Sequence, residues 1–214
     1  MTEAEWPAIG NPKPMLRLLE KQKRLGDRKL RLFSCACGRR FWDVLTGLDR
    51  KVVELAEDFA DGRVSEWELG IASDAACEAQ PDDDELEGED YRIAQAQIAA
   101  TTCASIREYM VETSQELLKA AKRKSTERLA QCQVLQDIFG NPFRPVVADP
   151  AWLTPTVVAI ATAIYADRAF DRMPILADAL EEAGCTNADV LLHCRSDRPH
   201  VRGCWVVDLV LGKE

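Results

Sequence analysis

A chain of 214 residues and 23.9 kDa is long enough for one domain or two small ones. Hydrophobic residues make up 47% and charged residues 29%, which is typical of a globular protein and excludes a chain that is disordered throughout. The net charge of -9 makes nucleic acid an unlikely main partner, because proteins that bind a duplex usually carry a basic balance.

Apolar side chains recur at three- or four-residue steps along nearly the whole chain, which predicts helices. Pro12 and Pro14 suit the first turn of the first helix. We expect Asp27 to cap the next helix. Ser65 and Glu68 have the spacing of a capping box at the start of another.

Good helix formers fill residues 91–123, ahead of a further helix that ends at Gly140. We expect Ser125 or Thr126 to interrupt and recap the chain between these helices. The apolar face of the later helix is expected to include Leu129.

Residues 140–153 are the clearest candidate for a linker, since their three prolines resist both helix and sheet. We interpret this segment as a clamp between two halves. The predicted organisation is an N-terminal helical region over 1–139, the clamp, and a C-terminal helical region over 154–214. We expect residues 128–139 to pack with the C-terminal region as one compact unit.

Capping signals predict three helices in the C-terminal region, opened by Thr154 with Pro155, by Pro174 and by Asn187. The apolar run 205–211 fits a buried strand or a helix, and we favour a helix because no partner strand is evident. The predicted fold class is all-α, a multi-helix orthogonal or irregular bundle with few or no strands. A short strand at 143–147 is the exception we would allow.

Acidic residues are concentrated in one part of the chain. Residues 46–90 hold 3 basic and 16 acidic side chains, a net charge of -13. A block of like charges is usually a solvated loop or helix start. The alternative is a docking patch for a basic partner, whose candidate interaction residues are Asp82, Asp83, Asp84 and Glu85.

Hydrophobic segments and cysteine usage indicate the cellular compartment of the protein. No apolar run approaches the roughly 18 residues that a membrane span needs, and the first residues lack the basic and apolar regions of a signal peptide. Eight cysteines invite a disulfide framework, but such frameworks belong to short secreted chains. We therefore expect reduced thiols in a cytoplasmic protein that does not bind membranes.

Two histidines and three cysteines lie within 20 residues near the C-terminal end, enough for a four-ligand zinc site. The candidate ligands are Cys185, His193, His200 and Cys204, because His200 and Cys204 would share a helix face at i,i+4. The chain has no C-x-x-C pair, so the spacing is not a standard zinc pattern. The alternative is small core thiols and two ordinary surface or loop histidines.

Other sulfur chemistry has weaker support. Cys35 and Cys37 would point about 200° apart on a helix, which favours a structural role. A nucleophilic set of His200, Cys204 and Asp208 would follow one helix face, but the apolar neighbours of Cys204 indicate burial. Motifs of P-loop, hydrolase-elbow or metalloprotease type are absent, so we expect no catalytic residue.

Residues 190–212 resemble a single HEAT-type helical repeat, in which a short turn joins two apolar helices. The matching positions are the turn at 197–199, the pair Val201 and Arg202, and the close at 211–212. The resemblance implies that Val201 opens the second helix and packs inward, while Arg202 braces the turn. It departs at Gly203, where the family prefers a helix former. HEAT arrays need several stacked repeats, and this chain offers at most one and a half.

More broadly, the chain resembles a family of uncharacterised planctomycete-type bacterial proteins. The resembling segments are MTEAEW at 1–6, DRKLRLF at 27–33, DIFGNPFRP at 137–145, WLTPTVV at 152–158 and the stretch 200–213. The likeness spans most of the chain outside 63–127. It implies a bacterial source and no particular activity.

Two hypotheses follow. The first is a helical protein–protein interaction or regulatory module without catalysis, whose partner is another protein and whose oligomeric state is open. The second is a small zinc-binding or thiol-dependent protein that uses the C-terminal cysteines and histidines, with zinc as its one candidate cofactor.

Overall fold

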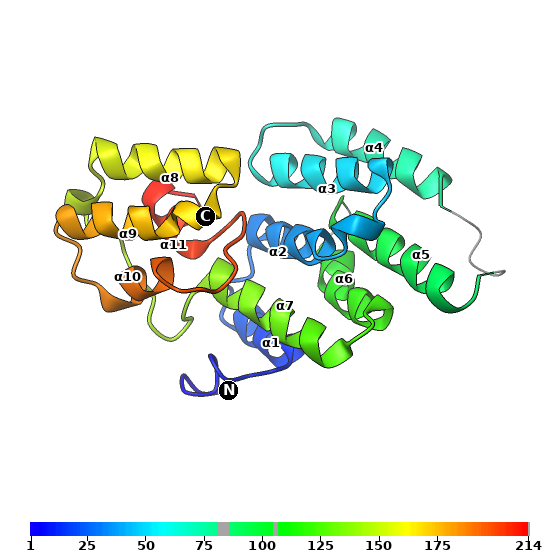
Figure 1. The fold of residues 1–214 in the computed structure, drawn as a ribbon, viewed down its shortest axis with the longest axis horizontal. Helices are drawn as coiled ribbons and strands as arrows, with labels where there is room; N and C mark the ends of the chain where they lie inside the picture. The colour runs from blue at the N-terminus through cyan, green and yellow to red at the C-terminus, as the bar shows by residue number, and fades with distance from the viewer. Residues whose placement is uncertain (81–85, 105–106, 214) are drawn as a thin grey trace. The chain divides into compact units, whose positions relative to one another are not determined.

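The computed structural model describes residues 1–80, 86–104 and 107–213, without the side chains of 107–113. Within these ranges the chain forms eleven α-helices and no strand (Figure 1), which confirms the all-α prediction. Residues 143–147 are not a strand, and 205–211 are helical as expected. The candidate interaction residues Asp82, Asp83, Asp84 and Glu85 lie outside the described residues. Among the helices described, none combines the length and apolar character needed to cross a membrane.

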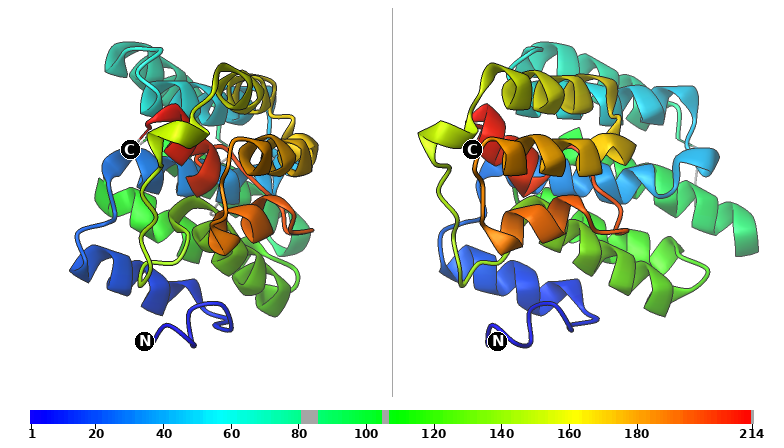
Figure 2. Two further views of the ribbon diagram at one scale, coloured as in Figure 1. Left: turned by 90° about the vertical axis from the view of Figure 1, so that its left-hand side faces the viewer. Right: turned by 60° about the vertical axis from the view of Figure 1, so that its left-hand side comes forward.

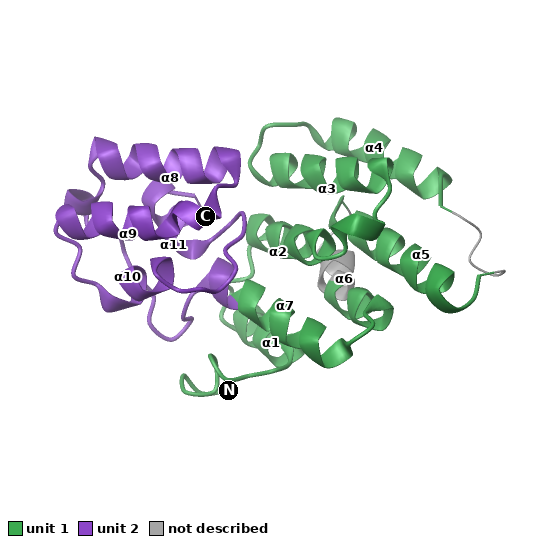
Figure 3. Cartoon of the chain, in the orientation of Figure 1, with its two compact units in different colours: residues 1–135 green, residues 136–214 purple. Residues whose placement is uncertain are grey.

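The chain divides into two compact units, residues 1–135 (unit 1) and 136–214 (unit 2), coloured separately in Figure 3. The boundary falls within helix α7, Lys124–Phe139, rather than in the proline-containing segment 140–153. That segment belongs to unit 2 together with the last turn of α7.

Unit 1 is built around helix α2. Its helices are α1 (Pro12–Lys21), α2 (Asp27–Arg39), α3 (Gly47–Ala60), α4 (Glu66–Glu78), α5 (Gly88–Thr101), α6 (Arg107–Ala120) and most of α7. Helix α2 packs against α3, α5 and α6, and residues 30–38 are buried on every side. Leucine, phenylalanine, cysteine, alanine and glycine fill most of this stretch, as expected for a helix without a solvent face, and the two polar residues, Arg31 and Ser34, bond backbone carbonyls. Both views of Figure 2 place α1 at one edge of unit 1.

Most of the expected helix starts are confirmed. Ser65 and Glu68 form a reciprocal capping box at α4, with the Glu68 carboxylate accepting the Ser65 backbone N–H at 2.8 Å. Thr154 and Asn187 likewise cap α8 and α10 through side-chain oxygens. These signals are local in sequence, which is why they could be recognised without knowledge of the packing.

Three local expectations are wrong. Gly26, not Asp27, caps α2, because the Leu30 N–H already bonds the Gly26 carbonyl and places Asp27 in the first turn. The break before α7 lies at 121–123, and Ser125 and Thr126 fall inside the helix. Leu129 is 51% exposed, because the buried face of α7 runs instead through the following position, Ala130.

Unit 2 contains α8 (Pro155–Asp167), α9 (Met173–Glu182), α10 (Ala188–Cys194) and α11 (Trp205–Leu211). Helix α8 packs against α9 and α11, and α10 packs against α9. The segment 140–153 packs on this unit, since Trp152 lies partly buried against its core. Within the segment, the Asn141 side chain accepts the Phe143 N–H at 3.0 Å. Arg144 faces the Asp189 carboxylate at 3.6 Å, in the same unit.

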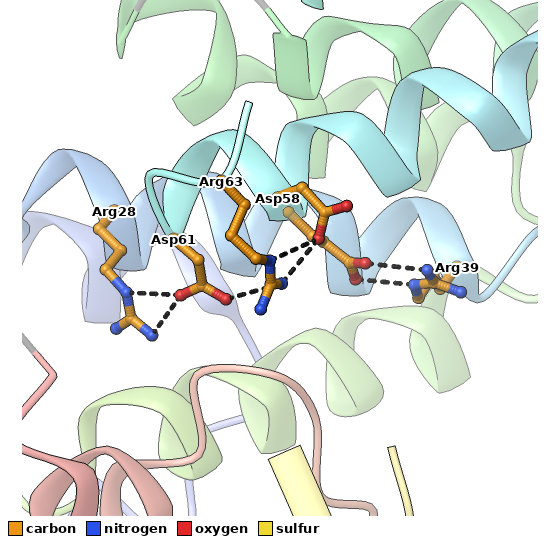
Figure 4. Close-up of polar contacts among 6 residues, drawn as sticks. Arg28, Arg39, Asp58, Asp61 and Arg63 are labelled. Carbon is orange, nitrogen blue, oxygen red and sulfur yellow. Dashed lines mark hydrogen bonds and ion pairs between the residues drawn. The ribbon is translucent and has the colours of Figure 1, made fainter. Parts of the chain in front are cut away.

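Ion pairs join α2 to α3 and the chain that follows it in unit 1 (Figure 4). Arg39 forms two hydrogen bonds with Glu57, at 2.7 and 2.9 Å, and Arg28 pairs with Asp61 at 3.2 Å. Arg63 reaches Asp61 as well, at 3.0 Å. The carboxylates of Glu57 and Asp61 are 2% and 1% exposed, so each depends on its arginine partners for stabilisation of a buried charge.

We expect Asp61→Ala to lower the free energy of unfolding by about 2–4 kcal/mol, because it removes a buried carboxylate shared by two arginines. Asp58→Ala removes a carboxylate that is 36% exposed and pairs with the same Arg63, and should cost less than about 1 kcal/mol. Urea unfolding followed by circular dichroism measures both. Equal costs would contradict the importance of burial here.

Candidate metal centre

Four side chains that can bind a metal ion meet within unit 2. Asp137 comes from the last turn of α7 and His193 from α10, while His200 and Cys204 come from the segment 195–204 between α10 and α11. One ligand atom from each residue lies within 4.8 Å of all the others. The group is the one such cluster found in the described part of the chain.

The distances within the cluster can be compared with those between the ligands of a tetrahedral ion. Asp137 Oδ1 lies 2.6 Å from His200 Nδ1 and 3.1 Å from His193 Nε2. Cys204 Sγ lies 3.2 Å from His193 Nε2 and 3.9 Å from His200 Nδ1. Zinc bonds of roughly 2.0–2.3 Å in tetrahedral geometry separate neighbouring ligand atoms by about 3.3–3.6 Å. Three of the four distances are shorter than that range and one is longer, so zinc binding requires the ligand atoms to shift.

Each imidazole presents one nitrogen to both the carboxylate and the sulfur. His193 uses Nε2 toward Asp137 and toward Cys204, and His200 uses Nδ1 toward both. In a nucleophile–His–Asp relay the histidine instead uses its two nitrogens for two different partners. The use of one nitrogen for both partners suits a set of candidate metal ligands and differs from a proton relay.

A tight turn over residues 201–204 brings His200 and Cys204 close to Asp137 and His193. The Cys204 N–H bonds the Val201 carbonyl at 2.9 Å, and Gly203 has φ 90°, a left-handed conformation that favours glycine at the third position of such a turn. The Val201 N–H donates to Asp137 Oδ2 at 2.8 Å, which fixes the turn against α7. The guanidinium of Arg202 lies over the Tyr165 ring, 5.2 Å from its centre.

The second helix begins at Trp205, after this turn, rather than at Val201 as the likeness to a HEAT repeat implied. For the same reason His200 and Cys204 do not share a helix face. Their proximity comes from the turn, and Gly203, the position that departs from the repeat pattern, makes that turn possible.

Burial and hydrogen bonding act in opposite directions on the Asp137 carboxylate, and burial dominates at the Cys204 thiol. The side chains of Asp137 and His200 are each 4% exposed, and Cys204 is fully buried. Burial raises the pKa of Asp137, but hydrogen bonds from His193 and His200 outweigh it and hold the pKa below its usual value. Burial and then the charge of Asp137 raise the pKa of the Cys204 thiol well above its usual value, against the opposing effect of the Val206 and Val207 N–H groups.

Three of the four expected ligands are brought together, and the fourth is different. Cys185 is not a member of the cluster, and Asp137 takes its place. The neighbouring Cys194 is also outside the cluster, and burial, followed by the charges of Asp137 and Cys185, raises its pKa to about 12. Asp208 is buried in α11 and does not join the group.

Asp137 was missed because nothing near it in sequence suggests a metal. One signal was present: Asp137 lies between Leu135 and Ile138 in a run that is buried at most positions. A carboxylate on an apolar helix face needs a partner, since an isolated buried charge is very costly.

The cysteines of the protein are free thiols, as predicted. None of the eight forms a disulfide. Cys35 and Cys37 are buried, and burial raises the pKa of both thiols well above the usual value. Both are therefore poor nucleophiles, as expected for cysteines that fill a core.

Gly140 lies against Trp205, whose ring packs on one of the cluster's histidines. It follows the last turn of α7 at φ 62°, and a Cβ there would lie 3.1 Å from the Trp205 ring. That ring in turn packs against His193, with ring centres 5.2 Å apart.

Gly140→Ala should lower the free energy of unfolding by about 2–3 kcal/mol, because it adds backbone strain and crowds the Trp205 ring. Gly212→Ala, at φ 63° with open space around it, is the matched control and should cost about 1–2 kcal/mol in thermal or urea unfolding. An equal cost would mean that the contact with Trp205 adds nothing.

Comparisons with protein-family models, curated proteins and solved structures found no match to this chain.

Proposed function

We propose that unit 2 is a zinc-binding unit in which Asp137, His193, His200 and Cys204 hold one ion. The observation that carries this proposal is the convergence of two nitrogens, one oxygen and one sulfur on a common point. Two imidazoles and a thiolate favour zinc over the hard cations calcium and magnesium, which take oxygen ligands. Four protein ligands fill a tetrahedral ion, so the site is of the structural kind.

The role of the ion would be to hold three separate segments together. Its ligands come from the end of α7, from α10 and from the turn before α11. Helices α10 and α11 have seven residues each, too few to be stable by themselves. An ion that binds the folded unit and not the unfolded chain adds its binding free energy to stability.

A thiol-dependent activity is less well supported. A reactive cysteine is partly exposed and has a lowered pKa. Cys204 is fully buried and its pKa is raised by that burial. A bound zinc ion would reverse this protonation, because a coordinating thiol loses its proton.

Purified protein is expected to contain one zinc per chain by elemental analysis, and a chelator should lower its melting temperature. Cys204→Ser and Asp137→Asn should each abolish stoichiometric zinc, because each removes a ligand. Stabilisation by free zinc at 100 times its dissociation constant would be about 2.7 kcal/mol.

Cys185→Ser is the matched control, since it removes a nearby cysteine that lies outside the cluster. It should keep full zinc content. Zinc well below one per chain in the wild type, or equal loss in Cys185→Ser and Cys204→Ser, would refute the proposed ligand set.

A second candidate function is interaction with another protein through α4. Trp67 is 74% exposed and Ile71 is 49% exposed, and at i,i+4 they share one face of the helix. The same helix carries only acidic charges, namely Glu66, Glu68, Asp74 and Glu78. An exposed tryptophan flanked by carboxylates suits a basic amphipathic helix, whose apolar side would cover Trp67.

Trp67→Ala should leave the free energy of unfolding unchanged within about 0.5 kcal/mol, because the side chain is mostly in solvent. The same variant should lose binding of a synthetic lysine- and leucine-rich amphipathic peptide in isothermal titration calorimetry. Leu192→Ala, a substitution of a leucine that is 69% exposed on α10, is the control and should bind normally. Peptide binding that survives Trp67→Ala would exclude this surface.

A further inference from the structure

Unit 1 has a small pocket with a basic rim. Its volume is about 280 Å³, and it is lined by the first residues of α1, the second half of α6 and the first turns of α7. Four of its lining residues are cationic: Lys13, Lys119, Lys124 and Arg128. Among the residues whose side chains the structure describes, none that lines the pocket is acidic, in a protein whose net charge is -9.

Three of these cations pair with no carboxylate among the described side chains. Lys119 pairs with Glu116 at 2.7 Å. Across the described residues, no ion pair or hydrogen bond involves the side chains of Lys13, Lys124 or Arg128. Like charges gathered around a concave surface raise the local potential and concentrate counter-ions. An anion in the pocket would relieve their mutual repulsion.

Helix orientation adds to this potential. Lys13 lies in the first turn of α1 and Lys124 is the first residue of α7, so the positive dipole ends of two helices face the pocket. The first turn of α1 contains prolines 12 and 14, and the Lys13 N–H already bonds Asn11. Helix α1 therefore contributes its dipole and the Lys13 side chain rather than free backbone donors.

The inner wall of the pocket has both apolar and polar side chains. Leu16 is buried and Leu118 is half-buried, while Gln115 offers a half-buried amide beside them. The volume lies just below the range of roughly 300–1,000 Å³ usual for small-molecule sites, which fits a compact ligand. An anionic group at the basic rim and a short organic body against the leucines would match this wall.

We propose that this pocket binds a small organic phosphate, with its phosphate group held by Lys13, Lys124 and Arg128. A phosphate dianion suits three cations better than a monoanion does, and an arginine can bind two of its oxygens at once. This site lies wholly in unit 1 and does not depend on zinc in unit 2.

Isothermal titration calorimetry on the full chain tests the proposal, with glycerol 3-phosphate as the probe and glycerol, inorganic phosphate and citrate as comparisons. Glycerol 3-phosphate should bind saturably at one site, more tightly than inorganic phosphate, and more weakly as salt is added. Lys124→Gln combined with Arg128→Gln should weaken binding by roughly tenfold or more, since two charge-assisted contacts are lost.

Two controls keep the result specific. Lys51→Gln, a substitution of an exposed lysine on α3, should leave the affinity unchanged, and Cys204→Ser should also leave it unchanged because that ligand belongs to unit 2. Absence of saturable binding, an equal loss in Lys51→Gln, or citrate binding as tightly as the organic phosphate would each overturn the proposal. Loss of binding in Cys204→Ser would place the phosphate at the metal centre instead.

Discussion

The structure of unit 2 depends on the compensation of one buried carboxylate. Asp137 is 4% exposed at the end of an apolar helix, where an unpaired charge would cost several kcal/mol. Two imidazoles and the Val201 N–H approach it, and these groups arrive only if α10 and the turn after it are in place. The fold of residues 193–204 is thus the way in which the charge of Asp137 is accommodated.

Unit 1 meets the same constraint in another way. Two of its buried carboxylates, Glu57 and Asp61, are each paired with an arginine on the neighbouring helix α2. Arginine keeps its charge at any accessible pH and holds no metal, so these pairs are purely structural. Histidine and cysteine partners, as at Asp137, can bind a metal ion, and this difference separates a candidate site from an ordinary buried ion pair.

Most features that depend on nearby residues could be predicted from the sequence, although the cap of α2 and the break before α7 were placed wrongly, and features that depend on distant residues could not. The capping box at Ser65 and the proline starts of helices follow from residues a few positions apart. The pairing of Asp137 with His200 spans 63 positions and that of Arg28 with Asp61 spans 33. Cysteine and histidine spacing led to zinc as a hypothesis, which assumed that His200 and Cys204 share a helix face, whereas Gly203 makes a turn there.

The separation of the four candidate ligands along the chain means that a bound ion would also lower the entropy of the unfolded chain. An ion that links Asp137 to His200 closes a loop of 63 residues, while His193 and Cys204 are only 11 positions apart. In the chain-entropy description of cross-links, closing a loop of that length restricts the unfolded state by about 4 kcal/mol. A chain with eight free thiols would in this way gain the topological restraint of a disulfide without forming one.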